Sequence, residues 1–253
     1  MTCNIRYAGA DDGHNGWAYR KDACIEVIRS RAPEIICFQE MWHEQRVDLS
    51  AAFDEFSSFG LTSRATDRHP ANTIFYRRDL FTSISAGGYW LSETPHVTGS
   101  KSWGSADVRL ANWVRLEDTR SQKEFRVIST HLDHISQTAR EQQARVITED
   151  AGAFPQDYPQ VLAGDMNCDG RNKAIMTFTE AGWKDTYKTV HGTDDPGHTF
   201  HEFQGPEHTT DIGKMDWIFA RGKTQVTGAQ VVTDTLNGRY PSDHYFVVAD
   251  LDI

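Results

Sequence analysis

The order of apolar and polar residues predicts a chain that alternates between short strands and amphipathic helices. Cys24, Ile25 and Ile28 recur at helical spacing. Pro33 ends the helix predicted over residues 17–31. Similar spacing predicts helices over 43–56, 136–153 and 171–180. Short apolar, β-branched and aromatic runs predict strands, and these cover residues 1–7, 34–39, 72–76, 81–89, 110–116, 125–130, 160–163, 215–220, 225–233 and 245–251.

Helices and strands are mixed along the whole chain, and several strands follow one another directly. This order predicts two packed sheets with helices outside them. The 253 residues suffice for a substantial core. No repeat or linker divides the sequence, so we expect one domain over residues 1–253. Two long loops, the aromatic segment 90–107 and the histidine-bearing segment 191–211, are expected to carry function.

The charge of the chain narrows the class of substrate. The formal net charge is −10 and no Lys/Arg cluster occurs along the sequence, whereas proteins that hold duplex nucleic acid usually present a basic face. We therefore favour a small phosphate ester as the partner over nucleic acid. The acidic pairs Asp11-Asp12 and Asp194-Asp195 are expected to be solvated loop charge.

The sequence also bears on location and assembly. No apolar run approaches the roughly 20 residues that a membrane-spanning helix requires. No signal peptide is visible, which favours the cytoplasm, and secretion remains the alternative if an N-terminal segment was removed. We expect a monomer.

Polar side chains occur at or near the ends of the predicted strands. Such groups can converge at one edge of a sheet, as a metal and phosphate site requires. They are Asn4, Gln39-Glu40, His131, Asp165 and Asn167, Asp216, and Asp243-His244.

In this order, these residues resemble the endonuclease/exonuclease/phosphatase superfamily, the group of deoxyribonuclease-like nucleases, inositol-phosphate phosphatases and sphingomyelinases. No single motif is specific, but six in register cover nearly the whole chain. The resemblance implies an α/β fold, a four-layer α-β-β-α sandwich of two mixed, mainly antiparallel sheets with helices on both outer faces. It also implies metal-assisted hydrolysis of a phosphate ester, with Mg²⁺ or alternatively Mn²⁺ as cofactor.

Three of these residues are candidate metal ligands. Mg²⁺ prefers oxygen ligands and often takes only one or two carboxylates from the protein. Glu40 would supply charge, and Asn4 would supply a neutral oxygen or orient a metal-bound water. Asp243 would contact this metal or a second one. Taken singly, Glu40 is better explained as a surface acid and Asn4 as a strand-end hydrogen-bonding group, and the whole set of residues favours the metal.

Asp165 and Asn167 are candidates for the chemical step. Residues two apart in an extended segment point the same way. Asp165 can therefore orient an attacking water or accept its proton, while the Asn167 amide binds a phosphate oxygen. An Asx turn is a second interpretation of the same sequence, and both can hold at once.

By resemblance, Asp216 holds the His244 ring and favours its charged form, which would stabilise charge in the transition state. The alternative for His244 is a core histidine. His131 occupies the position that contacts the scissile phosphate in the family. Asp133 and His134, which follow it, are equally well explained as a cap of the next helix.

The remaining candidates concern the substrate. Arg109 is predicted to hold phosphate, as a strand-start arginine often does in the family, with a salt bridge to Asp107 as the alternative. Residues 90–95, Trp-Leu-Ser-Glu-Thr-Pro, resemble a bacterial branch of the superfamily. Trp90 and Trp103 could stack on a sugar or base, or pack beneath the loop. His198 and His201 could line the rim of a pocket, or be exposed loop histidines, and His134 is a further substrate-binding candidate.

These features favour a metal-dependent phosphoesterase that acts on a small phosphodiester or phosphomonoester, such as a sugar phosphate or lipid head group. A metal-dependent nuclease of RNA or DNA is the alternative. A non-catalytic binding module, or a structural metal protein, is less favoured because no main site position carries an inert residue.

Overall fold

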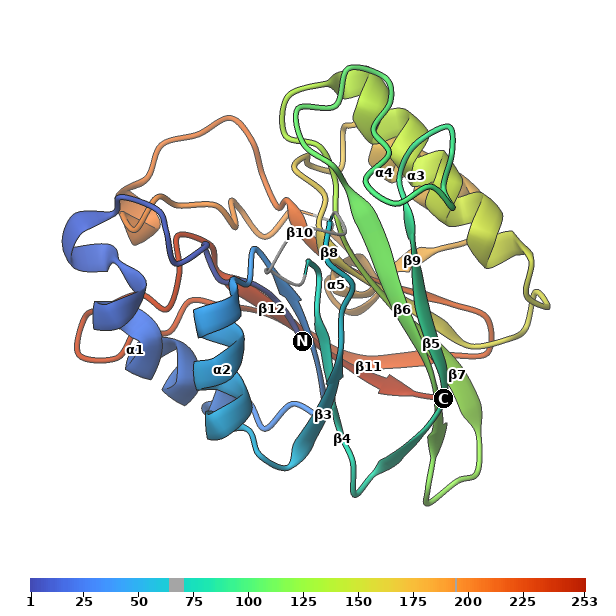
Figure 1. Ribbon diagram of the computed structural model, residues 1–253, viewed down its shortest axis with the longest axis horizontal. Helices are drawn as coiled ribbons and strands as arrows, with labels where there is room; N and C mark the ends of the chain where they lie inside the picture. Colours follow the sequence, from blue (N-terminus) through green and yellow to red (C-terminus); the bar gives the residue numbers. More distant parts are fainter. Residues whose placement is uncertain (64–70, 194) are drawn as a thin grey trace.

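Two six-stranded sheets pack face to face in the computed structural model, which describes residues 1–63, 71–193 and 195–253 (Figure 1). The first sheet has the order β11-β12-β1-β2-β4-β3, with bounds Gln225–Val232, Phe246–Asp252, Thr2–Asn4, Ile35–Gln39, Ile74–Arg77 and Phe56–Phe59. The second has the order β5-β6-β7-β8-β10-β9, with bounds Phe81–Trp90, Leu110–Asp118, Glu124–His131, Gln160–Asp165, Asp216–Arg221 and Lys184–Asp185.

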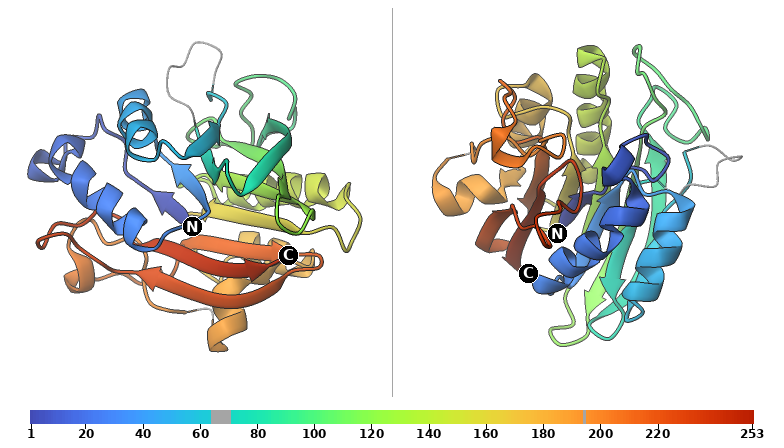
Figure 2. Two further views of the ribbon diagram at one scale, coloured as in Figure 1. Left: turned by 90° about the horizontal axis from the view of Figure 1, so that it is seen from below. Right: turned by 90° about the vertical axis from the view of Figure 1, so that its left-hand side faces the viewer.

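Helices cover both outer faces, which gives the predicted four layers (Figure 2). Helices α1 (Trp17–Ser30) and α2 (His43–Ala52) pack on the first sheet, and α3 (Gln137–Gly152) and α4 (Lys173–Glu180) pack on the second. Helix α5 (Thr186–His191) follows β9 and lies against β11. Within the described residues, two 3₁₀ turns occur in loops, η1 at Gly13–Asn15 and η2 at Gly205–Glu207.

Among the residues that the structure describes, three apolar clusters fill the spaces between these layers. Val127, Val161 and Ile218 belong to the cluster between the two sheets. Along β7, the next residue, Ile128, instead packs beneath α3 and α4. Both faces of the central strands are therefore buried, which explains why their sequences read as continuous apolar runs. The sheets are mixed, with the pairs β1–β2 and β7–β8 parallel and the other strand pairs antiparallel.

The structure corrects the sequence-based elements in three regions. The helix predicted over residues 43–56 ends at Ala52, and Phe56–Phe59 forms β3 beside β4. The short elements β9 and α5 were not predicted. The first strand ends at Asn4 rather than residue 7, and Arg6 has a positive φ of 50° that turns the chain.

The pairing of the strands gathers their ends at one edge of the sandwich. In the second sheet His131 lies opposite Asp165, which lies opposite Asp216. In the first sheet Asn4 lies opposite Gln39, next to Glu40. A cavity of about 830 Å³ opens between the sheets at the other end of these strands, where Ile35 begins β2.

No helix within the described parts of the chain is both long enough and apolar enough to cross a membrane.

Candidate active site

Asp165 lies at the centre of the polar cluster. Its Oδ2 accepts a hydrogen bond from Asn4 Nδ2 at 2.9 Å and lies 3.4 Å from Nε2 of His131 and 3.9 Å from Nε2 of His244. Asp165 is 1% exposed. Burial and the nearby charge of Asp216 raise the pKa of Asp165 to about 7. A carboxylate in this position can exchange a proton near neutral pH.

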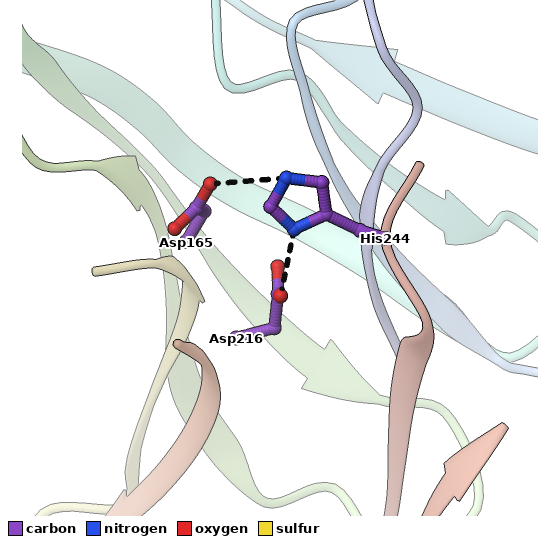
Figure 3. A group of neighbouring side chains, drawn as sticks. All are labelled: Asp165, Asp216 and His244. Atoms are coloured by element: carbon purple, nitrogen blue, oxygen red, sulfur yellow. Dashed lines mark hydrogen bonds and ion pairs between the residues drawn. The ribbon is translucent and has the colours of Figure 1, made fainter. Parts of the chain in front are cut away.

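Asp216 holds the ring of His244 from the opposite side (Figure 3). Nδ1 of His244 donates to Asp216 Oδ2 at 2.9 Å. Burial alone would lower the pKa of His244, but Asp216, followed by Asp165 and Asp243, raises it to about 10. The predicted pair of His244 and Asp216 is thus present in the structure. The ring is an imidazolium at neutral pH and lies between two buried carboxylates.

The pKa of His131 is shifted in the opposite direction from that of His244. It is 6% exposed, and burial followed by the positive charge of Arg109 lowers its pKa well below the ordinary value. Its imidazole ring is therefore neutral at neutral pH and can donate one hydrogen bond. The site thus combines a charged and a neutral histidine around one carboxylate.

Two further carboxylates lie at the first-sheet side of the cluster. Glu40 Oε1 accepts from Asn4 Nδ2 at 3.1 Å, and Glu40 Oε2 accepts from the backbone N–H of Tyr7 at 3.3 Å. Burial raises the pKa of Asp243, and the charge of Glu40 adds to this rise. The two acids therefore act on each other, and the set of Glu40, Asp243 and Asn4 offers only oxygen ligands to a cation.

Arg6 is a neighbour of this acidic pair that the sequence analysis missed. Its Nε lies 3.6 Å from Oδ2 of Asp243, and it bonds both carboxylate oxygens of Asp12 at 3.1 Å. The expectation that Asp12 is solvated loop charge was wrong, because its side chain is 13% exposed and ion-paired. Asp194 lies outside the described residues.

Asn167 completes an Asx turn at the end of β8. Its backbone N–H donates to Asp165 Oδ1 at 2.8 Å, as the turn interpretation predicted, and its φ is 51°. Its amide Nδ2 donates to the carbonyl oxygen of Leu132 at 2.9 Å. Asn167 therefore fixes Asp165 against the end of β7, and its proposed contact with phosphate stays a prediction.

Asp133 holds the loop before β6 against the loop after β7. It is fully buried, and its Oδ2 accepts from Ser105 Oγ at 2.8 Å and from the backbone N–H of Ala106 at 2.7 Å. Its Oδ1 accepts from the N–H groups of Ile135 and Ser136 at 3.0 and 2.6 Å. These bonds give Asp133 a structural role, but the expectation that Asp133 and His134 cap the next helix was wrong, because the cap of α3 is Ser136, whose side chain accepts from the N–H of Ala139.

We predict that Asp133→Ala destabilises the protein. Several backbone donors would lose their acceptor, which costs on the order of 3 kcal/mol. The melting temperature should fall by roughly 6–12 °C, measured by calorimetry, whereas Asp157→Ala at an exposed site should leave it nearly unchanged. An unaltered melting temperature for Asp133→Ala would show that water replaces these hydrogen bonds.

The substrate candidates fall into two groups. Trp103 is partly exposed, and Arg109 Nη2 lies 3.1 Å from Nδ1 of the exposed His134. Trp90 is 8% exposed and its Nε1 donates to the Ser63 carbonyl oxygen, which favours a packing role over stacking on a substrate. His201 has no exposed surface, which contradicts the expectation that it lines the pocket rim.

His201 is buried because residues 199–201 pair with the chain around His244. Its ring packs on Tyr240 and Tyr245, with centroid separations of 4.6 and 4.1 Å. Its backbone N–H donates to the carbonyl oxygen of Asp243 at 2.8 Å. These partners lie some forty residues later in the sequence, so the local pattern did not reveal them.

Thr199 is a second residue that the sequence analysis missed. It is fully buried, and its hydroxyl oxygen accepts from the backbone N–H groups of Met215 and Asp216 at 2.9 and 3.2 Å. Its carbonyl oxygen accepts from the backbone N–H of Tyr245 at 2.7 Å. Thr199 therefore joins the segments that carry Asp216 and His244. Only the tertiary structure reveals this arrangement.

Comparisons with known proteins agree with this architecture. The solved endonuclease/exonuclease/phosphatase from Bacteroides vulgatus is 30% identical, with a TM-score of 0.90 over 100% of this chain and 97% of that chain. The mannosyl-6-phosphatase Bt3783 of Bacteroides thetaiotaomicron VPI-5482 is 27% identical, with a TM-score of 0.90 over 100% and 98%.

A curated relative, the uncharacterized protein L388 of Acanthamoeba polyphaga mimivirus, is 25% identical over 163 residues. The match includes 61% of this chain and 60% of the viral protein, so the matched region is less than two thirds of that protein's length. The sequence model of the Endonuclease/Exonuclease/phosphatase family matches residues 1–244. The resemblance inferred from the strand-end residues is thereby confirmed, and the chain belongs to the Endonuclease/Exonuclease/phosphatase family.

Proposed function

We propose that this protein is a divalent-metal-dependent phosphoesterase that hydrolyses a small phosphodiester or phosphomonoester by in-line attack of water. The observation that carries the proposal is the position of Asp165, whose Oδ2 faces both His131 and His244. The family membership of the chain supports a phosphoester substrate. The similarity to a mannosyl-6-phosphatase supports a sugar phosphate.

A divalent cation fits the acidic pair at the first-sheet side of the cluster. Glu40 and Asp243 are the carboxylates that would hold it, and both influence each other electrostatically in the structure. The amide nitrogen of Asn4 bonds Glu40 and Asp165, so Asn4 would orient these groups or contribute its oxygen. Mg²⁺, or alternatively Mn²⁺, would neutralise charge on the phosphoryl and leaving oxygens.

Asp165, Asp216 and His244 also place three potential ligand atoms within 4.8 Å of one another. We assign the positive charge there to the His244 ring itself. Its Nδ1 already lies at hydrogen-bonding distance from Asp216, and a proton on each ring nitrogen satisfies both carboxylates.

The side chains then divide the work of hydrolysis. Asp165 orients the attacking water and accepts its proton. The His244 imidazolium, fixed by Asp216, stabilises negative charge that develops on the phosphoryl oxygens. The neutral His131 donates a hydrogen bond to the same group. Positioning and electrostatics account for most of such catalysis, and no covalent intermediate is needed.

The proposal is tested with p-nitrophenyl phosphate and bis-p-nitrophenyl phosphate, with Mg²⁺ or Mn²⁺ and with chelator. We expect turnover that chelator abolishes. Glu40→Gln should raise the metal concentration for half-maximal rate by about tenfold or more, whereas Glu44→Gln, an exposed acid on α2, should leave it unchanged. Turnover that persists in chelator would contradict metal dependence. Nicking of plasmid DNA at catalytic enzyme concentrations that is faster than hydrolysis of both p-nitrophenyl esters would favour the nuclease alternative.

A further inference from the structure

Arg109 is a largely buried cation without a close counter-ion. Its side chain is 13% exposed, and its ion-pair contact is with Asp107 Oδ2 at 3.9 Å, a carboxylate that is itself 64% exposed. Its Nε has no hydrogen-bond partner among the residues that the structure describes. A guanidinium that is shielded from water and weakly paired attracts an anion, because its charge is poorly compensated.

His134 extends this cation into a pair of hydrogen-bond donors. Arg109 Nη2 lies 3.1 Å from His134 Nδ1. A guanidinium only donates hydrogen bonds, so this contact assigns the acceptor role to Nδ1 and the ring proton to Nε2, while Asp107 Oδ2 lies farther from Nδ1, at 3.8 Å. The side chain of His134 is 45% exposed. The Nε2–H group of His134 is therefore a hydrogen-bond donor that lies beside Arg109 on a solvent-accessible side chain.

The strand register places this pair next to the catalytic cluster. Arg109 directly precedes β6, whose Ala111 lies opposite Thr130 of β7. His131 ends β7 and lies opposite Asp165. Adjacent strands are about 4.8 Å apart. Arg109 lies at the start of β6, and β6 is separated from β8, which carries Asp165, by β7 alone. The two strands are therefore about 10 Å apart. The positive charge of Arg109 also contributes, after burial, to the lowered pKa of His131.

The pair is held in place before any ligand binds. Asp133 accepts hydrogen bonds from the backbone N–H of Ala106, three residues before Arg109, and of Ile135, which directly follows His134. The hydroxyl of Ser136 donates to the carbonyl oxygen of Trp103 at 2.8 Å, which joins the same two loops. Little ordering is then required when an anion binds, which favours affinity and selectivity.

We propose that Arg109 and His134 form a subsite for the peripheral oxygens of a terminal phosphate, so that the enzyme selects phosphomonoesters over phosphodiesters. A phosphomonoester carries nearly two negative charges at pH 8, since its second pKa is about 6. In a diester one of these oxygens bears a carbon substituent instead of charge, and the guanidinium would stay uncompensated. This selectivity rests on the proposed phosphoesterase function.

The matched substrates are p-nitrophenyl phosphate and methyl p-nitrophenyl phosphate, which share a leaving group and differ by one methyl ester. The wild-type protein should prefer the monoester at pH 8. Arg109→Gln should lower kcat/KM for the monoester about 10- to 100-fold and for the methyl ester less than about threefold. His134→Ala should show the same asymmetry with a smaller loss. Arg115→Gln, on the same strand but paired with Glu124, is the control and should change neither value.

An equal loss on both substrates would overturn the proposal, since Arg109 would then bind any phosphate ester. A wild-type preference for the methyl ester would overturn it as well. Either result would leave metal-dependent hydrolysis intact, and the failure of the subsite is therefore distinguishable from failure of the proposed function.

A binding experiment tests the selectivity of the subsite independently of hydrolysis. Calorimetry with methyl phosphate and dimethyl phosphate, with and without Mg²⁺, should show tighter binding of methyl phosphate to the wild-type protein. Arg109→Gln should remove this preference. If no ester is hydrolysed but the preference is present and depends on Arg109, the subsite stands and the phosphoesterase function fails. Equal binding of both ligands to the wild-type protein would refute the subsite.

Discussion

Asp165→Asn is expected to lower kcat for phosphate-ester hydrolysis by about 10²- to 10⁴-fold, the range for removal of a general base. The amide has the shape of the carboxylate and can still accept from the backbone N–H of Asn167. It cannot take a proton from water, and it cannot balance the charge of the neighbouring His244 ring. The expected loss is therefore chemical and not a consequence of misfolding.

Stability measurements distinguish these causes. Burial and Asp216 already raise the pKa of Asp165, so its ionised form is costly in the folded state and its replacement should not reduce the melting temperature greatly. Steady-state kinetics with p-nitrophenyl phosphate and calorimetry would be run on Asp165→Asn and on Asp157→Asn, an acid at an exposed position. Near wild-type kcat in Asp165→Asn would mean that another group accepts the proton.

The layers of the fold could be predicted because the central strands carry their own signal. Strands such as β7 and β8 are buried on both faces and read as apolar runs. Short elements lack this signal. The two residues of β9 are held by the buried ion pair between Asp185 and Lys214, 2.8 Å long, and Lys214 also lies 3.8 Å from the ring centre of Trp217. Such long-range contacts leave no local pattern.

In the candidate site, too, one part could be predicted from the sequence and another could not. The identities of Asp165, Asp216 and His244 were accessible because each follows or precedes a recognisable strand, and their order resembles a family. Their hydrogen bonds were not accessible. The hydroxyl of Thr199 bonds the backbone N–H at Asp216, which aligns β10 with the residues before β12. A threonine in a long loop gives no indication of that role in the sequence.

Asp216→Asn should lower kcat about 10²- to 10³-fold at pH 8, the range for loss of one electrostatic stabiliser. In the wild-type protein Asp216 overcomes the effect of burial and raises the pKa of His244 to about 10. Without that carboxylate the buried ring would lose its proton at a much lower pH. The neutral imidazole could not stabilise a charged phosphoryl group as the imidazolium does.

The pKa of His244 determines the direction in which stability and kcat change with pH. The pKa of His244 in the folded protein lies above the value of about 6.5 in an unfolded chain. Its charged form therefore stabilises the wild-type protein fully below pH 6.5, and this contribution disappears as the pH rises through about 10. The alkaline limb of kcat should follow the same titration in the wild-type protein and move toward neutral pH in Asp216→Asn.

Ring-proton NMR of His244 across pH 6 to 10.5 would test this assignment directly, with Asp211→Asn, an exposed acid, as the matched control. A wild-type ring that titrates below pH 7 would show that Asp216 does not hold the charge. If the ring titrates near pH 10 but Asp216→Asn keeps full activity, His244 is charged without serving catalysis. If the pKa of His244 falls in Asp216→Asn together with kcat, the reaction depends on the charge of this imidazolium. The physical reason is that burial opposes that charge and Asp216 is the carboxylate bonded to the ring.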